Sequence, residues 1–589
     1  MFGQLTQNMT HYVSDIRIAA IAKNSLIKLL GPLLDHIIGL DKLQKLYRQH
    51  HFSGLNKQTF TAKLLKVLGV NIDGGQQLLS KIPSSGRFIV VCNHPYGMIE
   101  GLIIANLLFK KRRDTKIMAN VGLKIFKEIK DFFIFANPLI PKSPENSLAI
   151  KQCFNHLEND GVLVIFPAGR VSFFQKKMGI ISDAEWNRLT VQLVSKTQSS
   201  VLPVFISGTN SKIFHQLGVI YYRFRLLMLA REMLKLDQHK IKLTVHNSIT
   251  SKQLSALGDI KMKNDIIRLQ CYLNDENYLI PWQADEKNND FTEIISPSDK
   301  EMMINELKNL PDNQQLVVYR NFSVYYGYQY QAPQCVREIT RLREITFRQE
   351  NEGSGENCDT DQYDATYMHL FIFDHGDNEI IGAYRIGLTD KLRKNKDTKA
   401  LYLSQMFNFS AEFINQKEPC MEMGRSFIVE AHQNSFHGLL LLWKGIGAFV
   451  CQNPQYRTLY GTVSLSKLYD PRSITLINKI MVSATEGVTA KTPFVNSMHP
   501  ELADFLKKYH LDIDQLSILI KGIEEDGKDI PVLLKQYSKL GAVFHCLAID
   551  SNFNTTPGLL LSVNLPNAPE KLLKLYLGKG KKNYLAYHA

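Results

Sequence analysis

The sequence lacks the features that mark several large classes of protein. Its eight cysteines form no Cys-x-x-Cys pair, so neither a common zinc-binding spacing nor a disulfide framework is indicated. No charged and apolar leader with a small-residue cleavage site is present. No apolar run approaches the roughly 18 residues that a membrane-spanning helix needs. These absences predict a protein of the reducing cytoplasm that binds no metal.

Basic residues are in excess, but not in the arrangement typical of nucleic-acid binding. Residues 1–290 carry 38 Lys and Arg against 22 Asp and Glu, whereas residues 291–589 carry 32 against 34. KKRR at 110–113 is the one dense basic run, and no nucleic-acid-binding module is recognisable. We therefore expect no nucleic-acid partner. The basic first half instead favours an anionic lipid surface or an acidic carrier protein.

The length of 589 residues and the 44% share of hydrophobic residues predict at least two domains with sizeable cores. Residues 276–300 are polar and acidic and lack periodicity, so they predict a linker. The expected domains are residues 1–275 and residues 301–589. The first half alternates helical stretches with apolar runs that predict buried strands at 88–91, 162–166, 201–206 and 241–245. This alternation is typical of an α/β domain.

The second half has a different order of elements. Its periodicity predicts a helix at 337–347, strands at 368–373, 380–386 and 420–429, and a helix at 439–451. This order favours an α+β acyltransferase of the GNAT type, although a fold by itself does not settle a function.

Residues 21–43 carry apolar residues at helical spacing, with lysines among them. The pattern fits a helix lying in a membrane interface, as part of membrane-interacting helices at about residues 1–80. It fits equally well an amphipathic helix packed on its own domain.

The most informative stretch is NHPYGMIEG at 93–101, directly after an apolar run that predicts a buried strand. A histidine and a carboxylate at a strand end can act as a base and the group that orients it. His94 would take the proton of an attacking hydroxyl, while Glu100 would fix the tautomer and support the imidazolium. Two further motifs follow, FPAGRVS at 166–172 and VLPV at 201–204.

In this order and spacing the three motifs resemble the glycerolipid (lysophospholipid) acyltransferase family, so the first half is expected to be an O-acyltransferase. Five residues separate His94 from Glu100, where the family's usual motif has four and an Asp; this pattern matches a hemolysin-like branch. Ala168 replaces the Glu of the family's FPEGTRS motif, which implies an acceptor other than plain lysophosphatidic acid. The resemblance further implies substrate contacts at Gly97, Phe166, Pro167, Gly169, Arg170 and Pro203.

A second set of motifs lies between about residues 310 and 580: LR at 342–343, DQYD at 361–364, GAYR at 382–385, EMGRS at 422–426 and WKG at 443–445. Together they resemble the GNAT-type N-acyltransferases that make lyso-ornithine lipid, a branch distantly related to acyl-homoserine-lactone synthases. Such a reaction needs a proton acceptor for the attacking amine and a cation for the substrate carboxylate.

Candidate proton acceptors are Asp361, Asp364, His369 and Glu422. Candidate groups for the carboxylate or the phosphopantetheine of the donor are Arg343, Arg385, Arg425 and Ser426. Two alternatives remain open at this point. Glu422 and Arg425 can form a structural ion pair at a strand end, and His369 can be a hydrogen-bonded core histidine.

Two acyltransferase domains of different fold on one chain resemble the bifunctional ornithine lipid synthases. The resemblance implies that the second half N-acylates ornithine with a 3-hydroxyacyl group. The first half would then esterify the new hydroxyl, with His94 as base. The implied donors are acyl carrier protein thioesters or acyl-CoA, with no bound cofactor, and the implied location is peripheral, at the cytoplasmic face of the inner membrane.

Three alternatives stay open. The head group can be glycine, serine or lysine instead of ornithine. The first half can be a lysophospholipid acyltransferase regulated by the second half. The chain can also be a membrane-bound interaction protein without activity.

Overall fold

The computed structural model describes residues 17, 25–120, 123, 127–137, 143–220, 222–235, 240–245, 247–278, 291–393, 398–410, 412–413, 418–433, 435, 437–483, 485–495 and 498–589. The chain forms two compact units. The first combines Met1–Leu279 with Ser497–Lys528, and the second combines Ile280–Asn496 with Asp529–Ala589. The division at residue 279 falls inside the predicted linker, of which residues 279–290 lie outside the described part. The predicted division also needs a correction, because residues 497–528 join the first unit.

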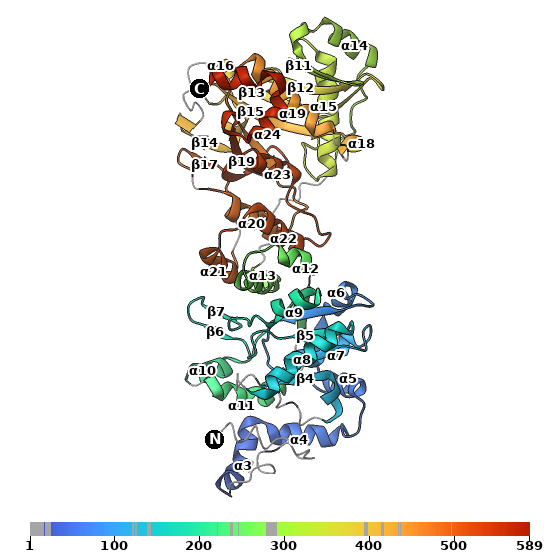
Figure 1. The fold of residues 1–589 in the computed structure, drawn as a ribbon, viewed down its shortest axis with the longest axis vertical. Coiled ribbons are helices and arrows are strands. Elements are labelled where there is room, and N and C mark those ends of the chain that lie inside the picture. Colours follow the sequence, from blue (N-terminus) through green and yellow to red (C-terminus); the bar gives the residue numbers. More distant parts are fainter. Residues whose placement is uncertain are drawn as a thin grey trace. The chain divides into compact units, whose positions relative to one another are not determined.

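The first unit is built on a seven-stranded sheet with the order β1-β9-β8-β2-β5-β3-β4 (Figure 1). Neighbouring strands are parallel except for the pair β8–β9. The strands are β1 (Asn71–Asp73), β2 (Phe88–Cys92), β3 (Lys116–Asn120), β4 (Phe133–Ala136), β5 (Val162–Ile165), β8 (Ser200–Ile206) and β9 (Lys240–Val245). The central strands β2 and β5 are buried at every residue, as their unbroken apolar runs predict.

Helices connect the parallel strands of this sheet, as crossovers between parallel strands require. The helices of the first unit are α3 (Ser25–Ile38), α4 (Leu40–Gln49), α5 (Lys57–Val67), α6 (Gly75–Lys81), α7 (Ile99–Leu108), η3 (Lys127–Phe132), α8 (Pro144–Glu158), α9 (Leu189–Thr197), α10 (Lys212–Ile220), α11 (Tyr222–Met233), α12 (Ser251–Ser255), α13 (Ile260–Tyr272), η4 (Glu276–Tyr278), α21 (Pro500–Lys508) and α22 (Ile513–Ile523). A small hairpin, β6 (Phe173–Gln175) and β7 (Ile180–Ser182), follows β5. Helix α7 is apolar all round and almost wholly buried, which places it in the core.

The second unit is built on an eight-stranded sheet with the order β10-β11-β12-β13-β15-β16-β19-β18. Its strands are β10 (Gln315–Tyr319), β11 (Phe322–Gly327), β12 (Met368–Asp374), β13 (Glu379–Leu388), β15 (Cys420–Ile428), β16 (Thr458–Ser464), β18 (Val543–Asp550) and β19 (Thr556–Asn564). All neighbours are antiparallel except β15 and β16. The three strands predicted from the sequence are β12, β13 and β15.

The helices of the second unit include the two that the sequence predicts, α15 (Pro333–Gln349) and α19 (His437–Gln452). The others are α14 (Lys300–Asn309), η5 (Asp312–Gln314), α16 (Thr389–Leu392), η7 (Tyr402–Gln405), α18 (Glu430–Gln433), α20 (Pro471–Met481), α23 (Val532–Lys539), η8 (Leu565–Asn567), α24 (Glu570–Leu577), η9 (Gly578–Gly580) and α25 (Lys581–Tyr587). A separate pair of short strands joins β14 (Phe407–Phe409) to β17 (Val488–Ala490). All eight cysteines are free thiols. Among the described residues, no helix has the length and apolar character needed to cross a membrane.

Candidate active sites

The first candidate site lies in the turn between β2 and α7, at the carboxyl end of a central parallel strand. Asn93 fixes this turn to the end of β8. Its side-chain amide donates to the carbonyl of Ile206 at 2.9 Å, and its side-chain oxygen accepts from the Ile206 N–H at 2.7 Å. Ligands of open α/β sheets bind at this edge of the strands. The sheet therefore presents His94 and Glu100 where a substrate is expected.

Gly97 gives the turn its shape. Its φ is 94°, a left-handed conformation that favours glycine, and an added Cβ would lie 2.5 Å from a methyl group of Val171. The backbone N–H groups of Tyr96 and Gly97 both donate to Oε1 of Glu100, at 2.5 and 2.8 Å. Gly97, predicted as a substrate contact, thus helps to hold the buried carboxylate.

His94 and Glu100 form a close pair, as the sequence predicts. Nδ1 of His94 lies 3.3 Å from Oε1 of Glu100, a contact that has ion-pair distance without well-aligned hydrogen-bond geometry. The Glu100 side chain is fully buried, and that of His94 is 17% exposed. Burial lowers the pKa of His94, but the Glu100 carboxylate outweighs it, so this pKa lies above its ordinary value of 6.5.

A change of Glu100 to Gln is expected to move the pH dependence of the first site. His94 acts as a base only when neutral, so the O-acylation rate should rise with pH through a midpoint above 6.5. Without the Glu100 carboxylate, burial lowers the pKa of the imidazole against only the smaller effect of Asp183, so the midpoint should fall. The measurement is kcat/KM for O-acylation against pH in both proteins. An unshifted midpoint would show that Glu100 does not set the ionisation of His94.

The other predicted contacts of the first half lie in different environments. The Phe166 ring packs on the His94 imidazole with centroids 4.6 Å apart. The carbonyl of Pro167 accepts two hydrogen bonds from Asn187, and Gly169 and Arg170 are exposed in the turn after β5. Pro203 is buried within β8, beside Val91 of β2. Phe166 is therefore directly at the site, whereas Pro203 shapes the sheet beneath it.

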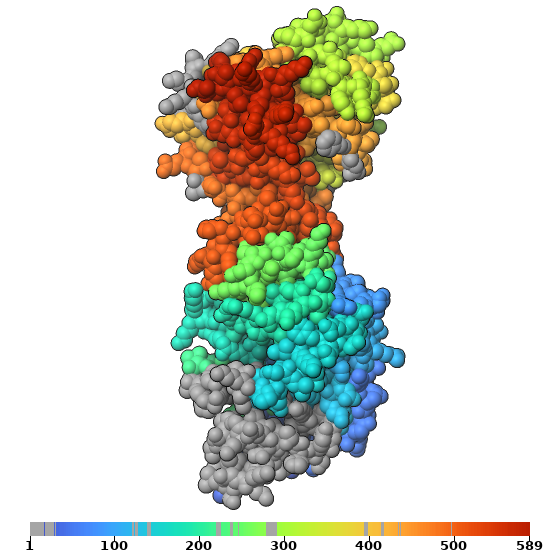
Figure 2. Space-filling model, viewed as in Figure 1, coloured from blue at the N-terminus to red at the C-terminus, as the bar shows by residue number. Residues whose placement is uncertain are grey.

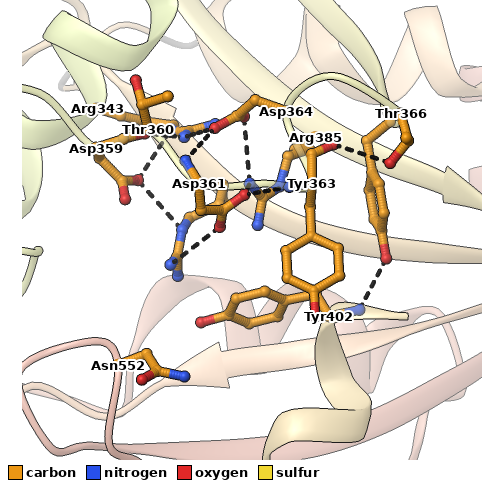
Figure 3. A network of polar contacts seen from close by, with 12 residues as sticks. Arg343, Asp359, Thr360, Asp361, Tyr363, Asp364, Thr366, Arg385, Tyr402 and Asn552 are labelled. Atoms are coloured by element: carbon orange, nitrogen blue, oxygen red, sulfur yellow. Dashed lines mark hydrogen bonds and ion pairs between the residues drawn. The ribbon is translucent and has the colours of Figure 1, made fainter. Parts of the chain in front are cut away.

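The second candidate site brings four of the predicted residues, Arg343, Asp361, Asp364 and Arg385, together in one largely buried network (Figure 3). Arg343 of α15 is fully buried and contacts Asp364, with Nη1 2.9 Å from Oδ1. Arg385 of β13 contacts Asp361 at 2.6 Å and Asp364 at 3.2 Å. Charges this deep are stable only when paired, and here each has an opposite partner.

Arg425 of β15 is the least tightly held of the three guanidinium groups. Its Nε lies 3.2 Å from Asp359, and its Nη2 lies 4.0 Å from Asp361. Its side chain is 9% exposed, whereas those of Arg343 and Arg385 are 0% and 2% exposed. The rings of Tyr402 and Phe553 flank it at 4.7 and 4.3 Å. Arg425 is thus the cation with most capacity left for a substrate anion.

The predicted proton acceptors differ in how easily each gains a proton. Burial raises the pKa of Glu422 to about 7, although the Leu403 N–H and the Tyr367 hydroxyl donate to it. Burial would raise the pKa of Asp364 as well, but Arg343 and Arg385 hold it well below its usual range. A general base works best with a pKa near the working pH, which singles out Glu422.

His369 supports the structure of this site and is not one of its reacting groups. It is fully buried in β12, its Nε2 lies 3.1 Å from the backbone carbonyl of Asp364, and burial lowers its pKa to about 4. The predicted alternative of a Glu422–Arg425 ion pair is wrong, because Arg425 pairs with Asp359 and Asp361 instead.

The sheet opens next to this network. Strands β15 and β16 pair in parallel only from Cys420–Thr458 to Met423–Gly461. Beyond that point neither strand pairs with the other, although both continue, and Arg425 adopts a φ of 49°. Ser426 follows Arg425 in this unpaired stretch. Parted strands leave backbone N–H and C=O groups for an extended ligand with amide groups of its own.

The sequence did not predict several residues of the two sites. Asp183 accepts the backbone N–H of His94 at 3.1 Å, and Asp359 links Arg343 to Arg425. Burial raises the pKa of Glu352, which accepts from Ser464, to about 7. Asp183 lies among other polar and charged residues, such as Ser182 and Glu185, so no local pattern marks it. Within the described ranges, no group of three His, Cys, Asp or Glu residues is arranged to hold a metal ion.

Comparisons with known proteins agree with this geometry. A family model described as an acyltransferase matches residues 35–279, and one described as an acetyltransferase (GNAT) domain matches residues 342–444. The glycine N(alpha)-acyltransferase of Bacteroides thetaiotaomicron is 30% identical over 291 residues, which are 46% of this chain and 86% of the relative.

Two further relatives are more distant. The lyso-glycine lipid O-acyltransferase of Phocaeicola vulgatus is 28% identical over 169 residues, 28% of this chain and 58% of the relative. The L-ornithine N(alpha)-acyltransferase of Agrobacterium fabrum is 25% identical over 237 residues, 39% of this chain and 75% of the relative.

The protein is an acyltransferase, with an acyltransferase domain of α/β fold followed by a GNAT-like domain of α+β fold, as the sequence predicts. More particularly, the chain belongs to the N-acyltransferase family that includes the glycine N(alpha)-acyltransferase of Bacteroides thetaiotaomicron.

Proposed function

We propose that the protein makes an amino-acid lipid in two consecutive acyl transfers, with ornithine as the head group. The observation that carries the proposal is the presence of two complete candidate sites on one chain. One is the His94–Glu100 pair, and the other is the buried network around Arg425 and Glu422. The relatives named for N-acylation and for O-acylation support the same pair of reactions.

The first transfer joins the α-amine of the amino acid to a 3-hydroxyacyl thioester. The nitrogen attacks the thioester carbonyl, the C–N bond forms and the C–S bond breaks. Glu422 takes the amine proton, and a proton passes to the departing thiol. Arg425 binds the substrate carboxylate, and the gap between β15 and β16 takes the amide-bearing pantetheine arm of acyl carrier protein, or of acyl-CoA.

The second transfer esterifies the 3-hydroxyl of that product. Its oxygen attacks a second thioester, His94 takes the hydroxyl proton, and the thiol leaves. A small apolar cavity of about 30 Å³, partly open to solvent, adjoins this turn. Its lining includes Tyr47, Phe52, Leu64, Met98, Leu102 and Met233. Because Met98 is part of the His94–Glu100 turn, this apolar lining marks where an acyl chain of a substrate held at His94 would enter, once the surrounding side chains move apart.

Glycine is the second candidate head group, since the glycine relative is more similar to this chain than the ornithine relative. The two differ in one chemical group, the side-chain ammonium of ornithine. Among the described residues Oδ2 of Asp361 accepts no hydrogen bond, and the Nη2 of Arg425 lies 4.0 Å from it, so this oxygen has capacity left for that ammonium. This carboxylate favours ornithine.

The test is expression in a bacterium that lacks amino-acid lipids, followed by mass spectrometry of lipids from cells fed labelled ornithine or labelled glycine. A diacyl lipid carrying the ornithine label is the expected product. A diacyl lipid that carries the glycine label instead would show that the head group is glycine. No new lipid from well-expressed protein would favour a lysophospholipid acyltransferase.

A peripheral attachment at the cytoplasmic face of the inner membrane is part of the proposal. Helix α3 exposes Leu29, Leu33, Leu34 and Ile37, by 79, 61, 36 and 48% of their surfaces. Four exposed apolar side chains on one short helix form a patch that water disfavours. The basic surplus of the first half would add attraction to anionic lipids.

The change Leu33→Asp is expected to weaken binding to vesicles that contain anionic lipid by roughly tenfold to a hundredfold, because one buried Leu contributes roughly 1.5–3 kcal/mol. The measurement is co-sedimentation at several vesicle concentrations. Leu148→Asp is the matched control, since Leu148 of α8 is 58% exposed and lies away from α3 in sequence. Equal binding by both variants would show that α3 does not contact the membrane.

A further inference from the structure

The segment 498–528 lies in the first unit although the chain before and after it belongs to the second. Helices α21 and α22 pack against α13 (Figures 1 and 2; the segment is orange-brown and α13 green). Asn247 donates to the carbonyls of Lys521 and Glu524 at 2.9 and 2.7 Å. At Gly522 an added Cβ would lie 2.2 Å from the Gln270 side chain, so the contact is intimate.

One ion pair in this contact is buried. Glu501 of α21 accepts from Arg268 of α13 through both oxygens, with Nε–Oε2 at 3.0 Å and Nη2–Oε1 at 2.6 Å. The two side chains are 8% and 10% exposed. A bidentate pair fixes the orientation of the guanidinium as well as its position.

Arg268 uses its remaining N–H groups on the loop that leads to the His94 site. Nη2 donates to the carbonyl of Asp183 at 3.0 Å, and Nη1 donates to the carbonyl of Ala184. The loop is thereby clamped at two consecutive carbonyls. A guanidinium turned away from Glu501 would lose this alignment.

The clamped Asp183 in turn holds the backbone of His94. Its Oδ1 accepts the His94 N–H at 3.1 Å and the Ser172 hydroxyl at 2.5 Å, and its Oδ2 accepts the Trp186 indole N–H at 2.8 Å. The Ser172 N–H donates back to the His94 carbonyl at 2.9 Å. Hydrogen bonds at both its N–H and its carbonyl therefore fix the backbone of His94.

We infer that Glu501, encoded in the second half of the chain, is a positioning residue of the O-acyltransferase site, acting through Arg268 and Asp183 on the His94 turn. The inference rests on the proposed O-acylation. Its consequence is that residues 1–279 alone do not contain a complete first site. Glu501 touches no substrate; it keeps the imidazole aligned with Glu100 and with the attacking hydroxyl.

The experiment compares three full-length variants with the wild type. Glu501→Gln removes the charge that orients Arg268. The double change Arg268→Met with Glu501→Met removes both charges, which often preserves folding, but it leaves Asp183 and Ala184 unclamped. Asp504→Asn is the matched control, because Asp504 lies on the same helix and, within the described ranges, pairs with Lys177 and Lys508, whose side chains are 82% and 47% exposed.

Four quantities are measured on each protein: the melting temperature, the N-acylation rate, and kcat and KM for O-acylation of added lyso-lipid. We expect Glu501→Gln and the double variant to lose about tenfold to a hundredfold in kcat, with KM and N-acylation retained, because small misplacements of a base carry costs of that size. Asp504→Asn should match the wild type. A double variant with normal kcat, or a parallel loss of both activities, would overturn the inference.

A labelling measurement separates this inference from the proposed function. Diethyl pyrocarbonate reacts with neutral imidazole, so the rate of His94 modification against pH, read by mass spectrometry, reports on His94 without any substrate. We expect Glu501→Gln to shift this profile and Asp504→Asn to leave it in place. If the wild type proves unable to O-acylate, the proposed function fails, and an unshifted profile would then overturn the inference as well.

Discussion

Replacing His94 with Ala is expected to stop the second transfer while leaving the first intact, so that a monoacylated amino-acid lipid accumulates. The imidazole is the base placed at the end of β2, and in the part of the chain that the structure describes it is the imidazole that contacts Glu100. Loss of a general base lowers a rate by about 10²- to 10⁴-fold. The measurement is the ratio of monoacyl to diacyl lipid in labelled cells, together with O-acylation of added lyso-lipid by purified protein.

Folding is the main competing explanation for such a loss, and N-acylation by the same molecules controls for it. His94→Asn provides a second variant that fills more of the space and keeps a polar group there. His50→Ala is the matched control, because His50 is an exposed histidine of the same unit. A normal diacyl level in His94→Ala would show that another group takes the hydroxyl proton.

The first site could be predicted from the sequence because its parts are local. An apolar strand, a turn with a required glycine and a carboxylate six positions after the histidine lie in one continuous stretch. Asp183 could not be predicted in this way, since its contact with His94 depends on how a hairpin after β5 folds back. Glu501 is still harder to predict, because it lies about 400 positions after His94 in the chain. Its contact depends on the packing of α21 against α13.

In the second half the sequence identified the members of the network but not their roles. Asp361, Asp364 and Glu422 are all carboxylates, and only burial and pairing distinguish them. Two arginines hold the pKa of Asp364 low, whereas Glu422 is buried without a cation in contact and has a pKa raised to about 7. These differences arise from long-range packing of α15, β13 and β15, which no local pattern records.

The change Arg425→Lys is expected to remove both lipids from cells, because N-acylation supplies the acceptor of the second transfer. Lysine keeps the charge but loses the planar fork that binds a carboxylate through two N–H groups. The looser contacts of Arg425, at 3.2 and 4.0 Å, leave that fork to the substrate. We expect N-acylation to fall about a hundredfold, since charge-assisted bidentate contacts contribute roughly 1.5–3 kcal/mol or more in a buried site.

A substrate role and a structural role of Arg425 predict different kinetics. Loss of a carboxylate contact should raise KM for the amino acid, and O-acylation of added lyso-lipid should stay normal because it takes place in the first unit. Arg341→Lys is the matched control, since Arg341 forms a largely buried ion pair with Glu338 on α15, outside the network. If Arg425→Lys lowers the melting temperature but leaves KM unchanged, Arg425 holds Asp359 in place and the substrate carboxylate binds elsewhere.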